Sequence, residues 1–305
     1  MKKLFAYIVL LGVSAFLCSC EKEMDCEGTA ETTFNVQVPA GATLTRTVSQ
    51  GENADVVYYE VWDEDFAKRL FPYPGSGDNV APIKGGSASI TLDLVREQVY
   101  NIIFWAQNSG CGAYRWSDLK EVNVDYSKFT ADQKDVYDAF YSVERVVVDG
   151  SPKSVYLYRP FAQVNFGASQ MNSSLGKILL QGNTVEISEV AGTFNTVAGV
   201  GENPVKNVVF STKADFVEDK TIEVDNSTLS WVAMNYLLVS STNVEVTANF
   251  STNFGNVRHV VENVPVQRNF RTNIVGDLFT TGASLRIIVK PDFVKPEIPP
   301  IEINQ

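Results

Sequence analysis

Residues 100–107 read Tyr-Asn-Ile-Ile-Phe-Trp-Ala-Gln, and this nearly continuous apolar run is the part of the sequence that decides the fold. Isoleucine and the aromatic residues are the types that favour β-strands. A strand that is apolar at successive positions has both of its faces covered by other parts of the protein. We therefore predict that residues 100–106 form a central strand of a β-sheet.

Alternation of apolar and polar residues continues in both directions from this run. Phe34, Val36 and Val38 alternate with polar residues, and the same period of two recurs in residues 57–61 and 90–94. This period is typical of strands with one buried face. Similar segments follow at residues 122–124, 146–148, 155–157, 161–166, 178–180, 185–187, 208–210, 222–224, 231–239, 244–250, 257–261 and 285–289. Turn-forming residues cluster between them, so we predict an all-β fold of sandwich type.

One segment favours a helix instead of a strand. Thr130-Ala-Asp-Gln133 fits a capping box, in which the Thr hydroxyl accepts a hydrogen bond from the Gln133 amide and the Gln side chain reaches back. We predict one short helix from Thr130 to about Tyr141, packed on the N-terminal domain.

The chain length and a polar stretch at residues 168–176 indicate two domains. We predict an N-terminal β-sandwich at residues 33–168 and a C-terminal β-sandwich at residues 169–290. The tail of residues 291–305 is rich in proline, and we predict that it is extended.

The first 19 residues predict export. Two lysines precede the apolar run Leu4–Leu17, which is shorter than the ~20 residues that a transmembrane helix needs, so it is read as a secretory signal. The run ends in Leu17-Cys-Ser-Cys20, which resembles a bacterial lipobox, where the last Cys is acylated and becomes the N-terminus. We predict removal of residues 1–19, lipid on Cys20 and a leader at residues 20–32. The alternative is ordinary signal cleavage beside an incidental Cys.

The composition argues against several classes of function. The net charge is −11 and the chain has a single His. An acidic chain is unsuited to the phosphate backbone of nucleic acids, and one His excludes multi-His metal sites and most His-based catalysis. We identify no catalytic constellation, and we predict a protein that is not an enzyme and has no metal or cofactor. The compartment permits a Cys26–Cys111 disulfide, but the polar leader around Cys26 favours two free thiols.

An ordered set of segments resembles the fimbrillin superfamily, the lipoprotein precursors of type V pili. The segments are residues 100–107, Tyr158-Arg-Pro-Phe-Ala-Gln-Val-Asn165, Gly192-Thr-Phe-Asn195, Ala233-Met-Asn-Tyr-Leu-Leu-Val239 and Val264-Pro-Val-Gln-Arg-Asn-Phe-Arg-Thr-Asn-Ile-Val-Gly276. The resemblance implies two tandem transthyretin-like β-sandwich domains. It also implies a cell-surface lipoprotein of the outer membrane that serves as a structural, anchor or tip subunit of a fimbria (pilus) in adhesion. Its partners would be other pilus subunits or surface ligands, with acyl chains in the membrane.

The resemblance further implies assembly by strand exchange. The replaceable strand is the first one, with Phe34, Val36 and Val38 as its buried residues. A trypsin-like protease would free it by cleavage after Arg46; the alternative is that Arg46 is an ordinary exposed residue and the protein stays anchored. The donor would come from the C-terminal region, where Leu285, Ile287 and Val289 alternate. The prolines after residue 290 cannot donate to a ladder, so a tip or anchor subunit that donates no strand is equally compatible.

A surface glycan-binding lipoprotein is the alternative function. Its candidate platform is Tyr114 and Trp116, which lie in a Gly-rich loop and could stack on sugar rings. Trp105 and Trp231 lie in apolar strand runs and are expected in the core.

Overall fold

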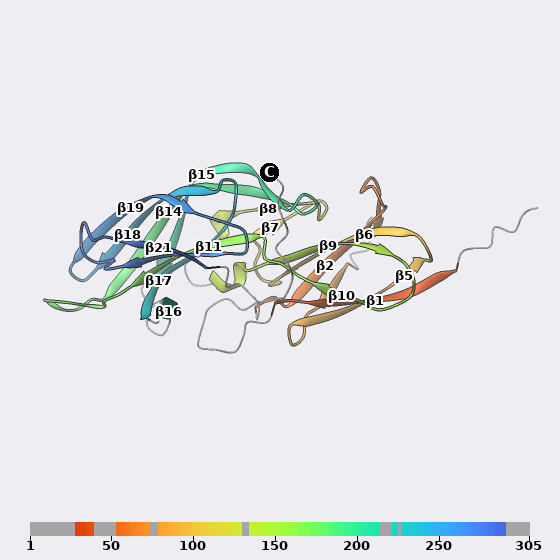
Figure 1. The fold of residues 1–305 in the computed structure, drawn as a ribbon, viewed down its shortest axis with the longest axis horizontal. Helices are drawn as coiled ribbons and strands as arrows, with labels where there is room; N and C mark the ends of the chain where they lie inside the picture. Colours follow the sequence, from red (N-terminus) through yellow and green to blue (C-terminus); the bar gives the residue numbers. More distant parts are fainter. Residues whose placement is uncertain are drawn as a thin grey trace, which may run out of the picture.

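The computed structural model describes residues 28–39, 53–72, 79–129, 134–213, 221–224 and 227–290, and the regular secondary structure of these residues is almost entirely β-strand (Figure 1). The strands are β1 (Thr29–Gln37), β2 (Val56–Trp62), β3 (Arg69–Phe71), β4 (Val80–Pro82), β5 (Ser87–Val95), β6 (Val99–Gln107), β7 (Tyr114–Arg115), β8 (Glu121–Val124), β9 (Phe140–Val147), β10 (Lys153–Tyr156), β11 (Phe161–Ala168), β12 (Asn172–Ser173), β13 (Gly176–Lys177), β14 (Leu180–Asn195), β15 (Val200–Lys213), β16 (Thr221–Val224), β17 (Ser227–Leu238), β18 (Asn243–Thr252), β19 (Gly255–Pro265), β20 (Arg271–Gly276) and β21 (Arg286–Lys290). The all-β prediction is confirmed.

Two sheets form the N-terminal part of the molecule. A three-stranded sheet has the order β10-β1-β5, and a five-stranded sheet has the order β3-β2-β6-β9 with β4 also paired to β2. Inward-facing side chains of both sheets share one core, which includes Phe34, Ile90, Ile102 and Phe104. As predicted, β6 is a central strand: it pairs with β2 on one side and β9 on the other, and its residues are buried on both faces.

One long sheet forms the C-terminal part, in the order β19-β18-β14-β17-β11-β20-β21. β14 meets β17 through a single residue pair, Ala191 and Leu238, and the sheet folds over at that point. The two arms then face each other across a second core, where the rings of Phe166 on β11 and Phe250 on β18 lie 5.6 Å apart. β15 extends the sheet from β14, and β16 extends it from β17.

A third core cluster connects the two halves of the chain. β7 and β8 continue the C-terminal sheet through pairing of β8 with β14, and β11 pairs with β17 and β20. Trp105 and Tyr114 from the first half pack with Phe194 and Tyr236 from the second. The proposed boundary between residues 168 and 169 remains a prediction. The structure shows that β7, β8 and β11 are hydrogen-bonded to strands that follow it.

The predicted helix is the main difference in secondary structure. Thr130–Gln133, which carry the capping box, lie outside the described residues. Lys134–Tyr137 form a single 3-10 turn, and β9 begins at Phe140. The strand prevails because Phe140 and Tyr141 pair with Ala106 and Trp105 of β6, and this pairing buries two aromatic rings that a short isolated helix would leave exposed. Within the described part of the chain, no helix has the length and apolar character needed to span a membrane.

Candidate functional site

The first described strand, β1, lies in the middle of its sheet. It pairs antiparallel with β5 along its whole length, from Thr29 opposite Val95 to Gln37 opposite Ser87. On its other side it pairs parallel with β10, with Phe34 opposite Lys153. β1 is therefore hydrogen-bonded to β5 along its whole length and to β10 along residues 34–37, and it lies between these two strands.

The inner face of β1 is fully apolar at its C-terminal end. Phe34, Val36 and Val38 are buried, and the Phe34 ring lies 5.9 Å from the Phe104 ring of β6. Burying side chains of this size contributes about 1.5–3 kcal/mol each. Together the three contribute an amount comparable to the net stability of a domain, about 5–15 kcal/mol.

The buried face of β1 also extends further toward the N-terminus than the sequence prediction placed it. The predicted leader ends at residue 32, yet the strand begins at Thr29, and both Ala30 and Thr32 are buried. The signal was present in the sequence, because Ala30, Thr32 and Phe34 continue the same period of two. Thr33, on the outer face, is hydrogen-bonded to Thr91 of β5 with 3.0 Å between the two hydroxyl oxygens.

Without β1, the N-terminal part would have a slot of defined chemistry. Its two sides are the backbone edges of β5 and β10, and its floor is the second sheet. Ile90 and Leu92 of β5 and Val155 of β10 face this slot and are buried beside β1. Such a slot accepts an extended segment with alternating apolar residues, because the edges supply hydrogen bonds and the pockets select every second side chain.

The C-terminal strand β21 has the opposite character. It pairs with β20 and is the last strand at its end of the sheet among the described residues. Ile287 and Val289 alternate along it as predicted, but they point outward and are 37% and 40% exposed. The structure thus describes one buried apolar strand at the start of the chain and one exposed apolar strand near its end.

Several predicted site residues lie outside the described residues. These are Cys20, Cys26, Arg46 and the tail of residues 291–305. Cys111 is described, and it is buried and free. Burial raises the pKa of the Cys111 thiol from its ordinary value of 9.0 to about 11.

The structure does not bring Tyr114 and Trp116 into a common exposed platform. Tyr114 is buried, its hydroxyl donates to the Tyr137 carbonyl, and its ring packs edge-on against Trp105 at 5.5 Å. Trp116 is half-buried and lies edge-on against Tyr58 at 5.0 Å. Tyr114 and Trp116 are two residues apart, so they lie on the side of the chain opposite the exposed Arg115, and both pack against the central cluster, which covers Tyr114. Trp105 and Trp231 lie in the core, as predicted.

The described residues contain no group of three or more His, Cys, Asp or Glu side chains arranged to hold a metal ion. The single His, His259, is buried on β19, and its Nε2 lies 2.9 Å from the Leu278 carbonyl oxygen. The imidazole of His259 therefore has a structural role, as a hydrogen-bond partner of the Leu278 backbone.

Comparison with protein families finds a match to the model of a family of unknown function, DUF6562, over residues 24–303. No curated protein sequence matches the chain.

Comparison with solved structures finds similar folds in adhesin-like and fimbrial proteins. A candidate cell adhesion protein from Bacteroides ovatus has a TM-score of 0.52 at 12% identity, over 86% of this chain and 96% of that one. A candidate adhesin from Bacteroides thetaiotaomicron has a TM-score of 0.50 at 8% identity, over 85% and 96%. The fimbrial anchor protein Mfa2 from Porphyromonas gingivalis is more distant, with a TM-score of 0.38 at 10% identity over 81% and 91%. The two Bacteroides structures therefore confirm, at the level of the fold, the resemblance stated from the sequence.

Proposed function

Since the chain belongs to the family of unknown function DUF6562, we propose from its fold and strand order that it is a surface-anchored fimbrial subunit that acts in adhesion. The observation that carries the proposal is the position of β1. This strand is apolar on its inner face, is paired on both edges, and is the first strand of the described chain, so a cut behind it can release it. The names of the structural neighbours, which include adhesion and fimbrial proteins, support the same role.

The proposed anchor is lipid on Cys20, placed in the outer membrane and facing the cell surface. β1 begins at Thr29, so the nine residues from Cys20 to residue 28 reach about 30 Å when extended. Acyl chains contribute about 0.8 kcal/mol for each buried CH₂, which makes two or more chains a stable anchor. The proposed role is structural and adhesive, with no catalytic step, metal or cofactor.

The proposed assembly step is proteolysis after Arg46 followed by strand exchange. The cut separates β1 from the rest of the chain, and loss of β1 leaves the slot between β5 and β10. A strand from another subunit then fills the slot. The exposed residues of β21, Ile287 and Val289, make this strand the best candidate donor within the described chain. An uncut subunit would keep β1 and its lipid and would serve as the anchor.

The test is incubation of the purified precursor with a trypsin-like protease, followed by gel electrophoresis without boiling and mass spectrometry of the new N-terminus. We expect a cut after Arg46, loss of the residue 20–46 fragment and a ladder of stable oligomers. Arg46→Ala should stay monomeric and lipidated, while Arg258→Gln, which is distant from the cut in the sequence, should behave like the wild type. Oligomers that form from Arg46→Ala as readily as from the wild type, or cleavage after Arg46 that leaves only monomers, would contradict strand exchange.

A further inference from the structure

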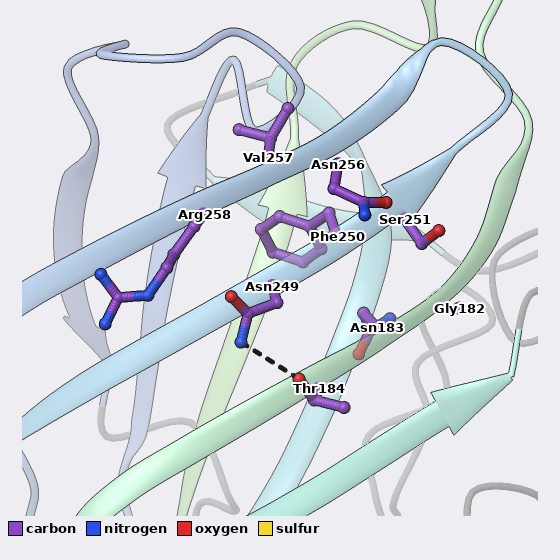
Figure 2. Close-up of a pocket in the computed structure, with 9 residues that line it drawn as sticks. All are labelled: Gly182, Asn183, Thr184, Asn249, Phe250, Ser251, Asn256, Val257 and Arg258. Atoms are coloured by element: carbon purple, nitrogen blue, oxygen red, sulfur yellow. Dashed lines mark hydrogen bonds between the residues drawn. The ribbon is translucent and has the colours of Figure 1, made fainter.

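The outer face of the C-terminal sheet carries a hollow of about 430 Å³ on strands β14, β18 and β19 (Figure 2). Three consecutive residues of each strand line it: residues 182–184, 249–251 and 256–258. The register of the sheet aligns these nine residues as three rows that cross the strands. The hollow is thus built by strands that are far apart in the sequence.

The middle row of the three forms the floor. Asn183, Phe250 and Val257 lie opposite one another, and their side chains are buried on the inner side of the sheet. Because these side chains point to the inner side of the sheet, the floor of the hollow consists of backbone. The two flanking rows are separated by two residues along each strand, which is about 7 Å.

The flanking rows form two polar walls. One wall is Thr184, Asn249 and Arg258, and Figure 2 shows these side chains in line across the strands, with Asn249 Nδ2 donating to Thr184 Oγ1 at 3.2 Å. The other wall is Ser251 and Asn256, with Gly182 at its end. Because Gly182 has no side chain, the groove is open at β14. The result is a groove that crosses the strands and offers amide, hydroxyl and guanidinium groups.

The backbone of the two inner strands, β14 and β18, is not available to a ligand in this groove. β14 pairs with β15 and β18, and β18 pairs with β14 and β19, so the amide and carbonyl groups of the floor are used within the sheet. A peptide strand that binds by adding to a sheet needs a free edge, which β14 and β18 do not have; β19 is the end strand of the sheet, and a strand added to it would lie beside the groove rather than across it. The occupant must be recognised by the side chains of the walls.

The charge of the groove is opposite to that of the protein. Arg258 is the only charged residue among the nine that line it, and it forms no ion pair with any described residue. The whole chain carries a net charge of −11. A free guanidinium in a wall without carboxylates favours an anionic group, and a carboxylate can receive two parallel hydrogen bonds from it.

We propose that this groove binds an acidic polysaccharide, with a uronic acid carboxylate on Arg258 and neighbouring sugar hydroxyls on Asn249, Thr184 and Asn256. Carboxamides and hydroxyls both donate and accept hydrogen bonds, as sugar hydroxyls require. The volume lies within the range of about 300–1,000 Å³ for small-molecule sites, and the open end lets a chain continue beyond it. The β18–β19 hairpin lies at the end of the molecule opposite β1 and β5 (Figure 1), which is the end farther from the proposed lipid anchor. The inference adds a ligand class to the proposed adhesion role and rests on that role only for its cellular setting.

The test is affinity gel electrophoresis and calorimetry of the uncleaved protein with polygalacturonate, alginate and hyaluronan, and with neutral galactan and dextran. We expect retardation by at least one acidic polymer, weaker binding as NaCl rises, and no retardation by the neutral polymers. Arg258→Gln should weaken binding at least tenfold, and Asn249→Ala severalfold. Arg115→Gln removes a 69% exposed arginine from the N-terminal half and should leave binding unchanged.

Three results would overturn the proposal: no binding to any of the three acidic polymers, equal binding to acidic and neutral polymers, or full affinity in Arg258→Gln. Circular dichroism of each variant separates loss of the ligand from loss of the fold. Because these measurements use uncleaved monomer, a failure here is distinct from a failure of protease-driven polymerisation, which tests the proposed assembly alone.

Discussion

Arg159 and Asp138 form an ion pair that is almost completely removed from solvent, with side chains only 1% and 3% exposed. Arg159 Nε donates to Asp138 Oδ1 at 2.5 Å, and a second nitrogen of the guanidinium bonds the other carboxylate oxygen. The guanidinium carbon also lies 4.7 Å from the centre of the Phe140 ring. Asp138 lies two residues before β9 and Arg159 two residues before β11, so the pair ties an N-terminal sheet to the C-terminal sheet.

Breaking this pair from one side should strongly destabilise the protein. Arg159→Leu leaves the Asp138 carboxylate buried without its cation, and we expect a loss of about 3–5 kcal/mol in the free energy of unfolding. Replacing both residues by leucine should cost less than Arg159→Leu alone. Urea unfolding followed by tryptophan fluorescence measures both values. The matched control is Arg145→Leu, which removes an exposed pair with Glu64 (58% and 56% exposed) and should cost less than about 1 kcal/mol. If Arg159→Leu and Arg145→Leu lowered the unfolding free energy by similar amounts, burial would not be the reason that the Arg159–Asp138 pair matters for stability.

The inner face of β1 should tolerate truncation poorly. Phe34→Ala removes a fully buried ring that packs on Phe104, and we expect a loss of about 3–5 kcal/mol in unfolding free energy. Asn35→Ala changes the next residue, which faces solvent, and should alter stability by less than about 0.5 kcal/mol. Denaturant unfolding of the two variants at one pH makes the comparison. Equal changes in unfolding free energy for Phe34→Ala and Asn35→Ala would mean that the apolar face of β1 is not packed in the core.

A glycine at the start of β15 should be irreplaceable. A Cβ atom on Gly201 would lie 2.6 Å from the Ala191 Cβ and still closer to the Val239 carbonyl oxygen. Both neighbours belong to the packed centre of the sheet, so Gly201→Ala should cost about 1–3 kcal/mol or more through forced backbone shifts. Gly28→Ala has open space around the new methyl group and should be nearly neutral. The melting temperatures of the two variants provide the check, and an unchanged value for Gly201→Ala would rule out this close approach.

The Cys111 thiol should be inert in the native state. Because burial raises the pKa of the Cys111 thiol to about 11, almost none of it is thiolate at pH 8. We expect peptide mapping to find the Cys111 peptide unmodified after N-ethylmaleimide treatment of native protein, and fully modified after treatment in guanidinium chloride. The thiol holds its proton more tightly in the folded state than in the unfolded one. Its contribution to stability is therefore complete below about pH 9 and is lost as the pH rises toward 11. Rapid labelling of native Cys111 would contradict the burial.

The exposed face of β21 should be dispensable for folding but required for exchange. Ile287→Ser combined with Val289→Ser removes two outward side chains, so the unfolding free energy of the monomer should change by less than about 1 kcal/mol. If β21 is the donor, the same variant should lose protease-driven oligomers, because its alternate side chains no longer fill the slot. If this variant forms oligomers like the wild type, β21 is not the donor strand, and the donor lies elsewhere in the chain.

Period-two alternation was sufficient to locate most strands and the inward residues of β1, β5 and β18. It was insufficient for β20, whose Thr, Asn and Arg residues break the apolar pattern, although this strand pairs parallel with β11. The parallel pairing of β1 with β10 was equally out of reach, since it joins residues more than 100 positions apart. The alternation of apolar and polar residues shows which face of a strand is buried. It does not show which distant strand pairs with it.

The site residues also divide into those that the local pattern of the sequence identifies and those whose position depends on distant contacts. Phe34, Val36 and Val38 were found because burial leaves a local signature. Tyr114 was misplaced because a two-residue strand between glycines and a tryptophan resembles an exposed loop, while its burial depends on Trp105 and Phe161. The polar groove was missed because Thr184, Asn249 and Arg258 look like ordinary outward residues of three strands. Only the register across the sheet brings them into one row.

The double pairing of β1 has a mechanical consequence. A pull on the chain before Thr29, directed along the strand, acts parallel to both β5 and β10. The nine residue pairs with β5 then share the load in shear, whereas a sideways pull would peel them apart one after another. If the protein is held at its N-terminal end in flowing liquid, the force acts along β1, the direction in which all of these residue pairs resist together. In the uncleaved chain, the strand that we propose proteolysis releases would therefore also transmit force from the proposed lipid anchor to the folded body.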